Sequence, residues 1–251
     1  MDSRIPILEL NRIRKSFGAV RAADDLSLRL LPGECHAVIG PNGAGKTSLI
    51  AQISGVLAPD SGNISFLGQK ITTWPIWRRS QAGIARSFQI ASIFPEFTVS
   101  ENVTLSIQAH KGHSFHFFKN TQYENQLAAA AQAILGQVGL EAKSNLRAAN
   151  LSHGEQRQLE LAMTLAGSPS LLLLDEPMAG MGATDSQRIV TLLRGLKGRV
   201  TILLVEHDMD AVFALADRIT VMVYGKVIAS GMPQEIKNNA DVRAAYLGQI
   251  V

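Results

Sequence analysis

The segment GPNGAGKT at residues 40–47 constrains the fold of this chain more than any other feature. It directly follows the apolar run of residues 34–39, which has the length of a β-strand. Glycines allow a tight loop whose backbone N–H groups point inward and bind phosphate oxygens. A helix is expected over residues 46–54, and a helix N-terminus also attracts anions. The segment matches the P-loop pattern G-x-x-x-x-G-K-[ST] and predicts a strand–loop–helix unit that holds phosphate groups.

Within this segment, two side chains have specific expected roles. The ammonium group of Lys46 is expected to reach the β- and γ-phosphates of a nucleotide, and the Thr47 hydroxyl to ligate Mg²⁺. A simple glycine-rich turn is the alternative interpretation, and the flanking strand and helix disfavour it. The predicted nucleotide contacts are Gly40, Pro41, Asn42, Gly43, Ala44, Gly45, Lys46, Thr47 and Ser48.

A second apolar run, residues 171–174, ends in two carboxylates, Asp175 and Glu176. Open α/β sheets bind ligands at the carboxyl ends of their strands. Asp175 is therefore expected in the Mg²⁺ shell, and Glu176 is placed to polarise an attacking water. A strand that ends in Asp-Glu is weak support alone, and it gains weight because it follows a P-loop.

The pattern of apolar residues predicts an α/β fold. Runs at 34–39, 171–174 and 201–205 lack alternation, as expected of parallel strands covered on both faces. Helical segments are expected at 155–166, 185–196 and 209–216. Residues 8–13 and 26–30 alternate and predict antiparallel strands beside the main sheet. Residues 100–167 are expected to be mostly helical, with a loop at 111–118.

Charge and composition exclude several classes of protein. The 251 residues include 24 Lys or Arg and 21 Asp or Glu, which gives a net charge of +3. Basic residues are scattered, so no nucleic-acid partner is expected, and the adjacent Arg78 and Arg79 are interpreted as a solvated surface pair. The single cysteine, Cys35, lies in an apolar run and is expected to be a buried, inert thiol in a reducing compartment. No apolar run approaches the roughly 20 residues of a membrane span, so a cytoplasmic chain is expected.

Residues 151–156 (LSHGEQ), taken with the P-loop and the Asp175-Glu176 strand end, resemble the nucleotide-binding subunits of ABC transporters. The family signature usually reads L-S-G-G-Q, so His153 and Glu155 depart from it while Ser152 and Gly154 are kept. The resemblance implies that Ser152, Gly154 and Glu155 contact the ATP of a second ATP-binding subunit, in a homodimer or a heterodimer. It also implies a P-loop NTPase core with a mostly parallel sheet, an antiparallel β-subdomain and a helical subdomain.

The same resemblance covers nearly the whole chain and assigns further roles. Gln89 resembles the glutamine that senses Mg²⁺ and water, His207 the switch histidine near the γ-phosphate, and Phe17 the aromatic residue that stacks on adenine. Residues 177–182 (PMAGMG) resemble the loop that contacts the partner subunit. Alone, such residues are more often surface, structural or core positions. The resemblance implies ATP hydrolysis with Glu176, His207 and Gln89 as the catalytic set and Thr47, Gln89 and Asp175 around Mg²⁺.

The resemblance implies one nucleotide-binding domain over 1–251. Its core and β-subdomain would comprise 1–89 and 166–251, and its helical subdomain 90–165. Residues 238–248 (NNADVRAAYLG) resemble the ending of branched-chain amino acid importer ATPases, whose relatives also import amides and urea. Residues 179–183 (AGMGA) differ from the common A-G-L-N-P, and a related variant with Met occurs in the urea and amide branch.

The implied partners are two transmembrane permease subunits and a periplasmic substrate-binding protein, with this chain at the inner face of the cell membrane. A lipopolysaccharide-exporting ATPase and a soluble, non-transport ABC protein stay open as alternatives.

Overall fold

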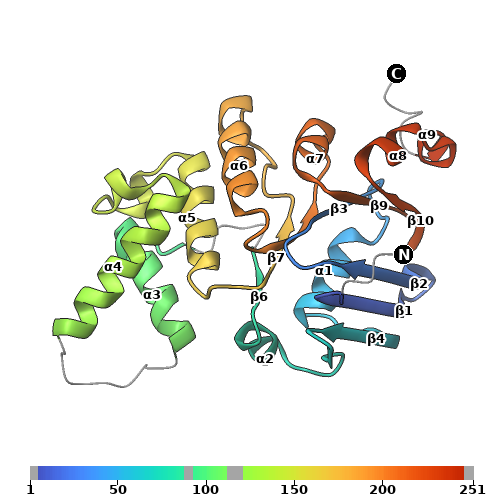
Figure 1. Ribbon diagram of the computed structural model, residues 1–251, viewed down its shortest axis with the longest axis horizontal. Helices are drawn as coiled ribbons and strands as arrows, with labels where there is room; N and C mark the ends of the chain where they lie inside the picture. Colours follow the sequence, from blue (N-terminus) through green and yellow to red (C-terminus); the bar gives the residue numbers. More distant parts are fainter. Residues whose placement is uncertain (1–4, 88–92, 112–120, 246–251) are drawn as a thin grey trace. The chain divides into compact units, whose positions relative to one another are not determined.

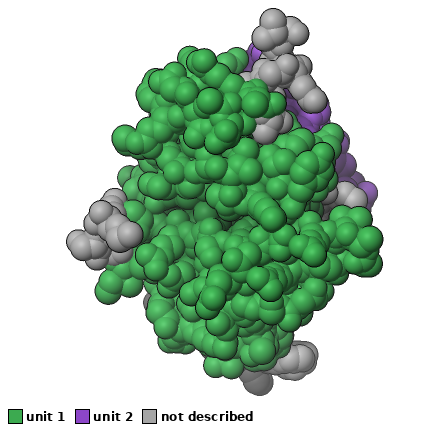
Figure 2. Space-filling view, turned by 90° about the vertical axis from the view of Figure 1, so that its right-hand side faces the viewer, with its two compact units in different colours: residues 1–84, 170–176, 193–251 green, residues 85–169, 177–192 purple. Residues whose placement is uncertain are grey.

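The computed structural model describes residues 5–87, 93–111 and 121–245. Contacts divide the chain into two compact units, shown in different colours in Figure 2. Unit 1 comprises residues 1–84, 170–176 and 193–251, and unit 2 comprises residues 85–169 and 177–192. Gln89 lies outside the described residues, as do positions 112–118 of the expected loop and the last three residues of the 238–248 segment.

Unit 1 contains a four-stranded antiparallel sheet in the order β2-β1-β4-β5 (Figure 1). Its strands are β1 (Leu8–Phe17), β2 (Val20–Leu30), β4 (Ser61–Phe66) and β5 (Gln69–Lys70). The pair β1–β2 confirms the antiparallel prediction, and both strands are longer than expected. They meet in a two-residue turn in which Gly18 has φ 58°, a conformation that glycine adopts at little cost.

The second sheet is mixed, in the order β10-β9-β3-β8-β7-β6. Three of its strands, β3 (Cys35–Ile39), β8 (Thr201–Val205) and β7 (Leu171–Asp175), are parallel and completely buried, as their continuous apolar sequences predicted. The remaining strands are β6 (Ile84–Arg86), β9 (Arg218–Val223) and β10 (Lys226–Gly231). A strand was expected near Phe88, close to β6, whereas β9 and β10 were not predicted. Cys35 is buried as expected, and burial raises the pKa of its thiol to about 12.

Helices cover both faces of this mixed sheet. Helix α1 (Lys46–Ser54), at its predicted bounds, buries Leu49, Ile50 and Ile53 in one core cluster with residues of both sheets. Val212, Ile236 and Val242 join a second cluster with β3 and β9. They belong to α7 (Met209–Leu215), α8 (Pro233–Asn238) and α9 (Ala240–Ala245). The end of β3 and the start of α1 are thus held rigidly between packed layers.

The short helix α2 (Ile76–Gln81) corrects one prediction. Arg78 is exposed and lies over the Trp74 ring at 4.0 Å, but Arg79 is only 2% exposed. The Arg79 guanidinium donates to the carbonyl oxygens of Trp74, Thr72, Gln52 and Ile53 over 2.7–3.0 Å. The interpretation of both arginines as solvated was wrong for Arg79, because its donors satisfy carbonyl groups in the last turn of α1 and in the segment before α2.

Unit 2 is mostly helical, as the sequence predicted for residues 100–167. Helices α3 (Val99–Lys111), α4 (Thr121–Val138) and α5 (His153–Leu165) pack against one another. Two short 3₁₀ turns, η1 (Glu141–Lys143) and η2 (Ala148–Asn150), precede α5. Helix α6 (Ala183–Leu196) begins in this unit. Buried side chains such as Val103, Leu127 and Leu159 form the apolar interior between the packed helices.

Candidate active site

The loop between β3 and α1 requires glycine for two separate reasons. Gly40, Gly43 and Gly45 all have positive φ, of 154°, 80° and 102°. A Cβ on Gly40 or Gly45 would also lie 2.0 Å from a backbone oxygen, of Met222 or Ala22 respectively. A Cβ on Gly43 would meet nothing within 4 Å. The loop is therefore pressed against β9 and β2 on one side and open on the other, where its N–H groups can bind an anion.

Lys46 is held inside the curve of this loop. Its Nζ donates to the carbonyl oxygens of Gly40 and Pro41, at 2.8 and 3.1 Å, and the residue is 5% exposed. Burial lowers the pKa of Lys46, and the charges of Glu176 and Asp175 oppose that shift. The geometry places one cation at the centre of a set of inward-facing backbone groups.

A hollow of about 300 Å³ opens over the loop. It brings together residues from five separate segments of unit 1. These are the end of β1, the start of β2, the loop with the first turn of α1, Glu176 after β7 and His207 after β8. Phe17 is 51% exposed at the end of β1 and offers a ring face at one side of the hollow. The lining residues are Phe17, Val20, Ala22, Asn42, Gly43, Ala44, Gly45, Lys46, Thr47, Ser48, Glu176 and His207.

Two side chains that are 31 residues apart in sequence meet at this hollow. His207 Nε2 lies 2.9 Å from Glu176 Oε1. Glu176 follows β7 directly, its N–H donates to the carbonyl of Val205 at 2.8 Å, and its φ of 53° turns the chain sharply. A left-handed conformation at a residue other than glycine costs energy and is typical of functional positions. The turn directs a carboxylate at the imidazole and at the hollow that also contains Lys46.

In unit 2, the LSHGEQ segment forms a capped helix N-terminus. Ser152 is the N-cap of α5 and accepts from the Glu155 N–H at 3.4 Å, while Glu155 Oε2 accepts from the Ser152 N–H at 3.1 Å. Glu155 also forms an ion pair with Lys143, which lowers the pKa of Glu155. The carboxylate expected to contact nucleotide thus has structural partners in its own unit. A Cβ on Gly154 would lie 2.5 Å from Asp185 Cγ, so only glycine fits where α5 meets α6.

Sequence comparison with known families identifies the chain. The ABC transporter family matches residues 23–179, and a branched-chain amino acid ATP-binding cassette transporter family matches residues 226–249. The chain belongs to the ABC transporter family. It is 36% identical to the high-affinity branched-chain amino acid transport ATP-binding protein LivG of Escherichia coli, an alignment that covers 97% of this chain and 98% of LivG. It is 34% identical to BraF of Pseudomonas aeruginosa, which is described in the same words.

Solved structures of ABC transporters have the same fold. A crystal structure of the ADP conformation of an ATP-binding cassette matches with a TM-score of 0.84 and 31% identity, and covers 97% of this chain and 99% of the other. A nucleotide-free cassette matches with a TM-score of 0.83 and 30% identity, and covers 96% and 99%. The α/β architecture with an antiparallel sheet is therefore that of an ABC ATPase.

The donor chemistry of this ABC site fits Mg²⁺. Thr47 lies in the first turn of α1, and Asp175 ends β7 with 2% exposure. Mg²⁺ usually takes one or two carboxylates together with substrate phosphates, not a complete protein cage. In the described part of the chain no three His, Cys, Asp or Glu side chains are grouped as such a cage would need. The Thr47 hydroxyl and the Asp175 carboxylate beside a phosphate-binding loop match a Mg²⁺ site in which substrate phosphates supply further ligands.

Sequence reasoning missed Glu206, although it directly precedes the switch histidine candidate. Glu206 is 3% exposed, and its Oε2 accepts from the N–H of His207 at 2.9 Å and of Asp208 at 3.4 Å. Asp208 in turn caps α7 by accepting from the Ala211 N–H. A carboxylate directly after an apolar strand was the available signal. The contacts fix the backbone that carries His207 toward Glu176.

No helix in the described ranges is both long and apolar enough to cross a membrane.

Proposed function

We propose that this chain is the ATP-hydrolysing subunit of an importer, and that it powers uptake of branched-chain or other small amino acids or amides. The observation that carries the ATPase assignment is the 2.9 Å contact between Glu176 and His207 at the hollow that also contains Lys46 and Thr47. The family match over residues 226–249 supports an importer over a lipopolysaccharide exporter or a soluble ABC protein. The transport of branched-chain amino acids that the names of the relatives LivG and BraF describe supports the same choice.

The lining of the hollow supports the binding of ATP. The N–H groups of the 40–47 loop and the dipole of α1 would bind the phosphates, with Lys46 at the β- and γ-phosphates and Phe17 against the base. Thr47 and Asp175 would hold Mg²⁺, which neutralises phosphate charge when it is bound. Gln89 stays a proposed contributor to that shell.

Hydrolysis requires a water in line with the bond between the γ-phosphorus and the bridging oxygen. Glu176 accepts a proton from that water as its oxygen bonds to phosphorus, and the bridging oxygen leaves with ADP. His207 orients the γ-phosphate and keeps the Glu176 carboxylate in place through the 2.9 Å contact. A positioned general base contributes about 10²–10⁴-fold to the rate.

A second ATP-binding subunit would complete the nucleotide site. Ser152 and the backbone N–H groups of the first turn of α5 would form an anion-binding end, and Gly154 allows this turn to pack closely against Asp185. We assign residues 1–251 to one nucleotide-binding domain, with the core and β-subdomain in 1–89 and 166–251 and the helical subdomain in 90–165. The remaining partners would be two permease subunits and a periplasmic binding protein, with the chain at the cytoplasmic face of the membrane.

The variant Glu176→Gln tests the ATPase assignment. We expect it to bind ATP as the wild type does and to hydrolyse it at least about 10²-fold more slowly, because the amide cannot take the proton. Glu124→Gln, an exposed substitution on α4, is the matched control and should hydrolyse ATP normally. Hydrolysis by Glu176→Gln at the control's rate would remove Glu176 from this role.

Transport is tested in vesicles that contain this chain and its cognate permeases. ATP-dependent accumulation of a labelled branched-chain amino acid or amide, supplied with the cognate binding protein, would support the importer assignment. Active efflux would favour the exporter, and ATP hydrolysis that neither the permeases nor the substrate changes would favour a soluble ABC protein.

A further inference from the structure

The start of α5 departs from the signature of its family in a way that changes its charge. The signature L-S-G-G-Q ends in an uncharged glutamine, whereas this chain has Glu155 at that position. A carboxylate in the first turn of a helix repels a phosphate that binds at the same helix end. We propose, on the basis of the proposed ATP-binding function, that Lys143 is a positioning residue. By neutralising Glu155, it lets the start of α5 bind the phosphates of the ATP held by the second subunit.

Both carboxylate oxygens of Glu155 have partners within unit 2. Oε1 forms an ion pair with Lys143 Nζ, and Oε2 accepts from the Ser152 N–H at 3.1 Å. The hydrogen bond from Lys143 is the main cause of the lowered pKa of Glu155, so the residue is fully ionised at neutral pH. The Glu155 side chain is only 16% exposed, and water and salt screen a charge in such a position weakly. Its negative charge therefore acts on the helix end unless a cation lies beside it.

The capping contacts determine which donors of this helix end can bind an anion. The N–H groups of Ser152 and Glu155 are bonded within the capping box, and the Gln156 N–H donates to the Ser152 carbonyl at 2.9 Å. The N–H groups of His153 and Gly154 belong to the first turn, where a helix offers its donors no internal acceptor. A phosphate at this end would therefore meet these two N–H groups with the Glu155 carboxylate in the same turn.

A second carboxylate at this turn is also paired with a basic residue. Asp185, on α6, packs so closely that a Cβ on Gly154 would lie 2.5 Å from Asp185 Cγ. Arg188 forms an ion pair with Asp185 at 3.1 Å. Each of these two carboxylates thus has its own cation. Removal of the Lys143 charge would leave the helix end with one uncompensated negative charge.

The backbone that carries Lys143 is fixed next to α5. The Lys143 N–H donates to the Leu140 carbonyl, and the Lys143 carbonyl accepts from the Leu146 N–H, both at 2.9 Å. Gln158, on α5, donates from Nε2 to the carbonyl of Val138 at the end of α4, at 2.8 Å. The Lys143 side chain is 42% exposed, so its ammonium group loses little hydration in the ion pair. A cation held in this way is in place before a nucleotide binds, which favours affinity.

Steady-state ATP hydrolysis tests the proposal in vesicles that contain this chain with its second ATP-binding subunit and its permeases. Lys143→Met keeps the apolar stem and removes the charge. We expect it to raise the KM for ATP at least about fivefold with little change in kcat, because the repulsion weakens the ground state and the transition state alike. A variant that only lost folded protein would instead lower the apparent kcat at an unchanged KM. Lys143→Arg should raise KM less than Lys143→Met, and Lys237→Met, an exposed substitution on α8, should not raise it.

A double-substitution cycle separates charge compensation from any other effect of Lys143. In the Glu155→Gln background there is no charge to neutralise, so adding Lys143→Met should change KM by less than about twofold. An equal rise of KM in both backgrounds would overturn the proposal. So would an unchanged KM for Lys143→Met alone, or a loss confined to kcat. Each of these results, obtained beside normal wild-type hydrolysis, leaves the ATPase assignment standing, whereas a wild-type complex that does not hydrolyse ATP would overturn that assignment and this proposal with it.

Discussion

Arg79 is expected to be one of the most important polar residues for the stability of this chain. Arg79→Met keeps an apolar stem of similar length but removes the donors to the carbonyl groups of Gln52, Ile53, Thr72 and Trp74. A buried acceptor left without a partner costs about 1–3 kcal/mol. The bonds to Gln52 and Ile53 are buried and the other two are part-buried, so the lower half of that range applies.

Four acceptors at about 1–2 kcal/mol each give about 4–8 kcal/mol. The guanidinium's own desolvation, which lowers the pKa of Arg79, is relieved in the variant and offsets part of this cost. We therefore expect a net loss of about 4 kcal/mol, a large share of the roughly 5–15 kcal/mol that stabilises a typical protein.

Urea unfolding followed by far-ultraviolet circular dichroism measures the effect. With a slope of about 2–3 kcal/mol per molar urea, the Arg79→Met midpoint should fall by roughly 1.3–2 M. The neighbouring Arg78→Met is the matched control. Arg78 is exposed and its guanidinium lies over the Trp74 ring, so its loss should cost about 1 kcal/mol or less. Equal midpoints for the two variants would refute the reasoning.

Three further outcomes follow from the site and core. Gly45→Ala should abolish ATP binding or prevent folding, because its Cβ would lie 2.0 Å from the Ala22 oxygen at φ 102°; near-normal nucleotide affinity in equilibrium dialysis would contradict this. The Cys35 thiol, with its pKa raised to about 12, should resist a thiol reagent at pH 8 in the native chain and react fully in denaturant. Glu206→Ala should lower kcat for ATP about tenfold with ATP affinity little changed, because it frees the backbone that positions His207; an equal loss of affinity would point to a general structural defect.

Much of the nucleotide site was predictable because its signals are local. The loop at 40–47, the strand that ends at Asp175 and the helix capped by Ser152 each depend on residues within a few positions of one another. The continuous apolar runs also predicted β3, β7 and β8, since a strand covered on both faces needs no polar alternation. The hairpin β9–β10 was missed although residues 219–223 (ITVMV) form an apolar run broken only by Thr220, because β10 (KVIASG) carries no such run.

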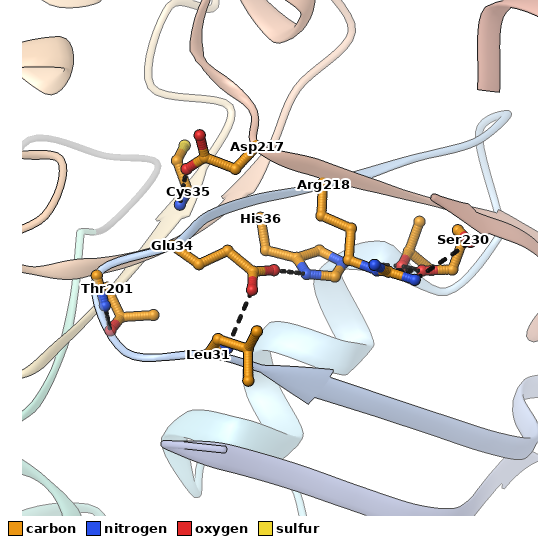
Figure 3. A network of polar contacts seen from close by, with 10 residues as sticks. Leu31, Glu34, Cys35, His36, Thr201, Asp217, Arg218 and Ser230 are labelled. Atoms are coloured by element: carbon orange, nitrogen blue, oxygen red, sulfur yellow. Dashed lines mark hydrogen bonds and ion pairs between the residues drawn. The ribbon is translucent and has the colours of Figure 1, made fainter. Parts of the chain in front are cut away.

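The sequence alone determined the fold class, the phosphate-binding loop and the family, because these follow from short motifs with their own local geometry. Only the tertiary structure decided the burial of Arg79, the contact of Glu176 with His207 and the packing of Gly45 on Ala22. It also gave Glu155 its capping role and joined Glu34 through His36 to Thr220 by buried hydrogen bonds (Figure 3). Most of these contacts join residues that lie far apart in the chain. Their energies come from desolvation and packing, which exist only once the layers have assembled.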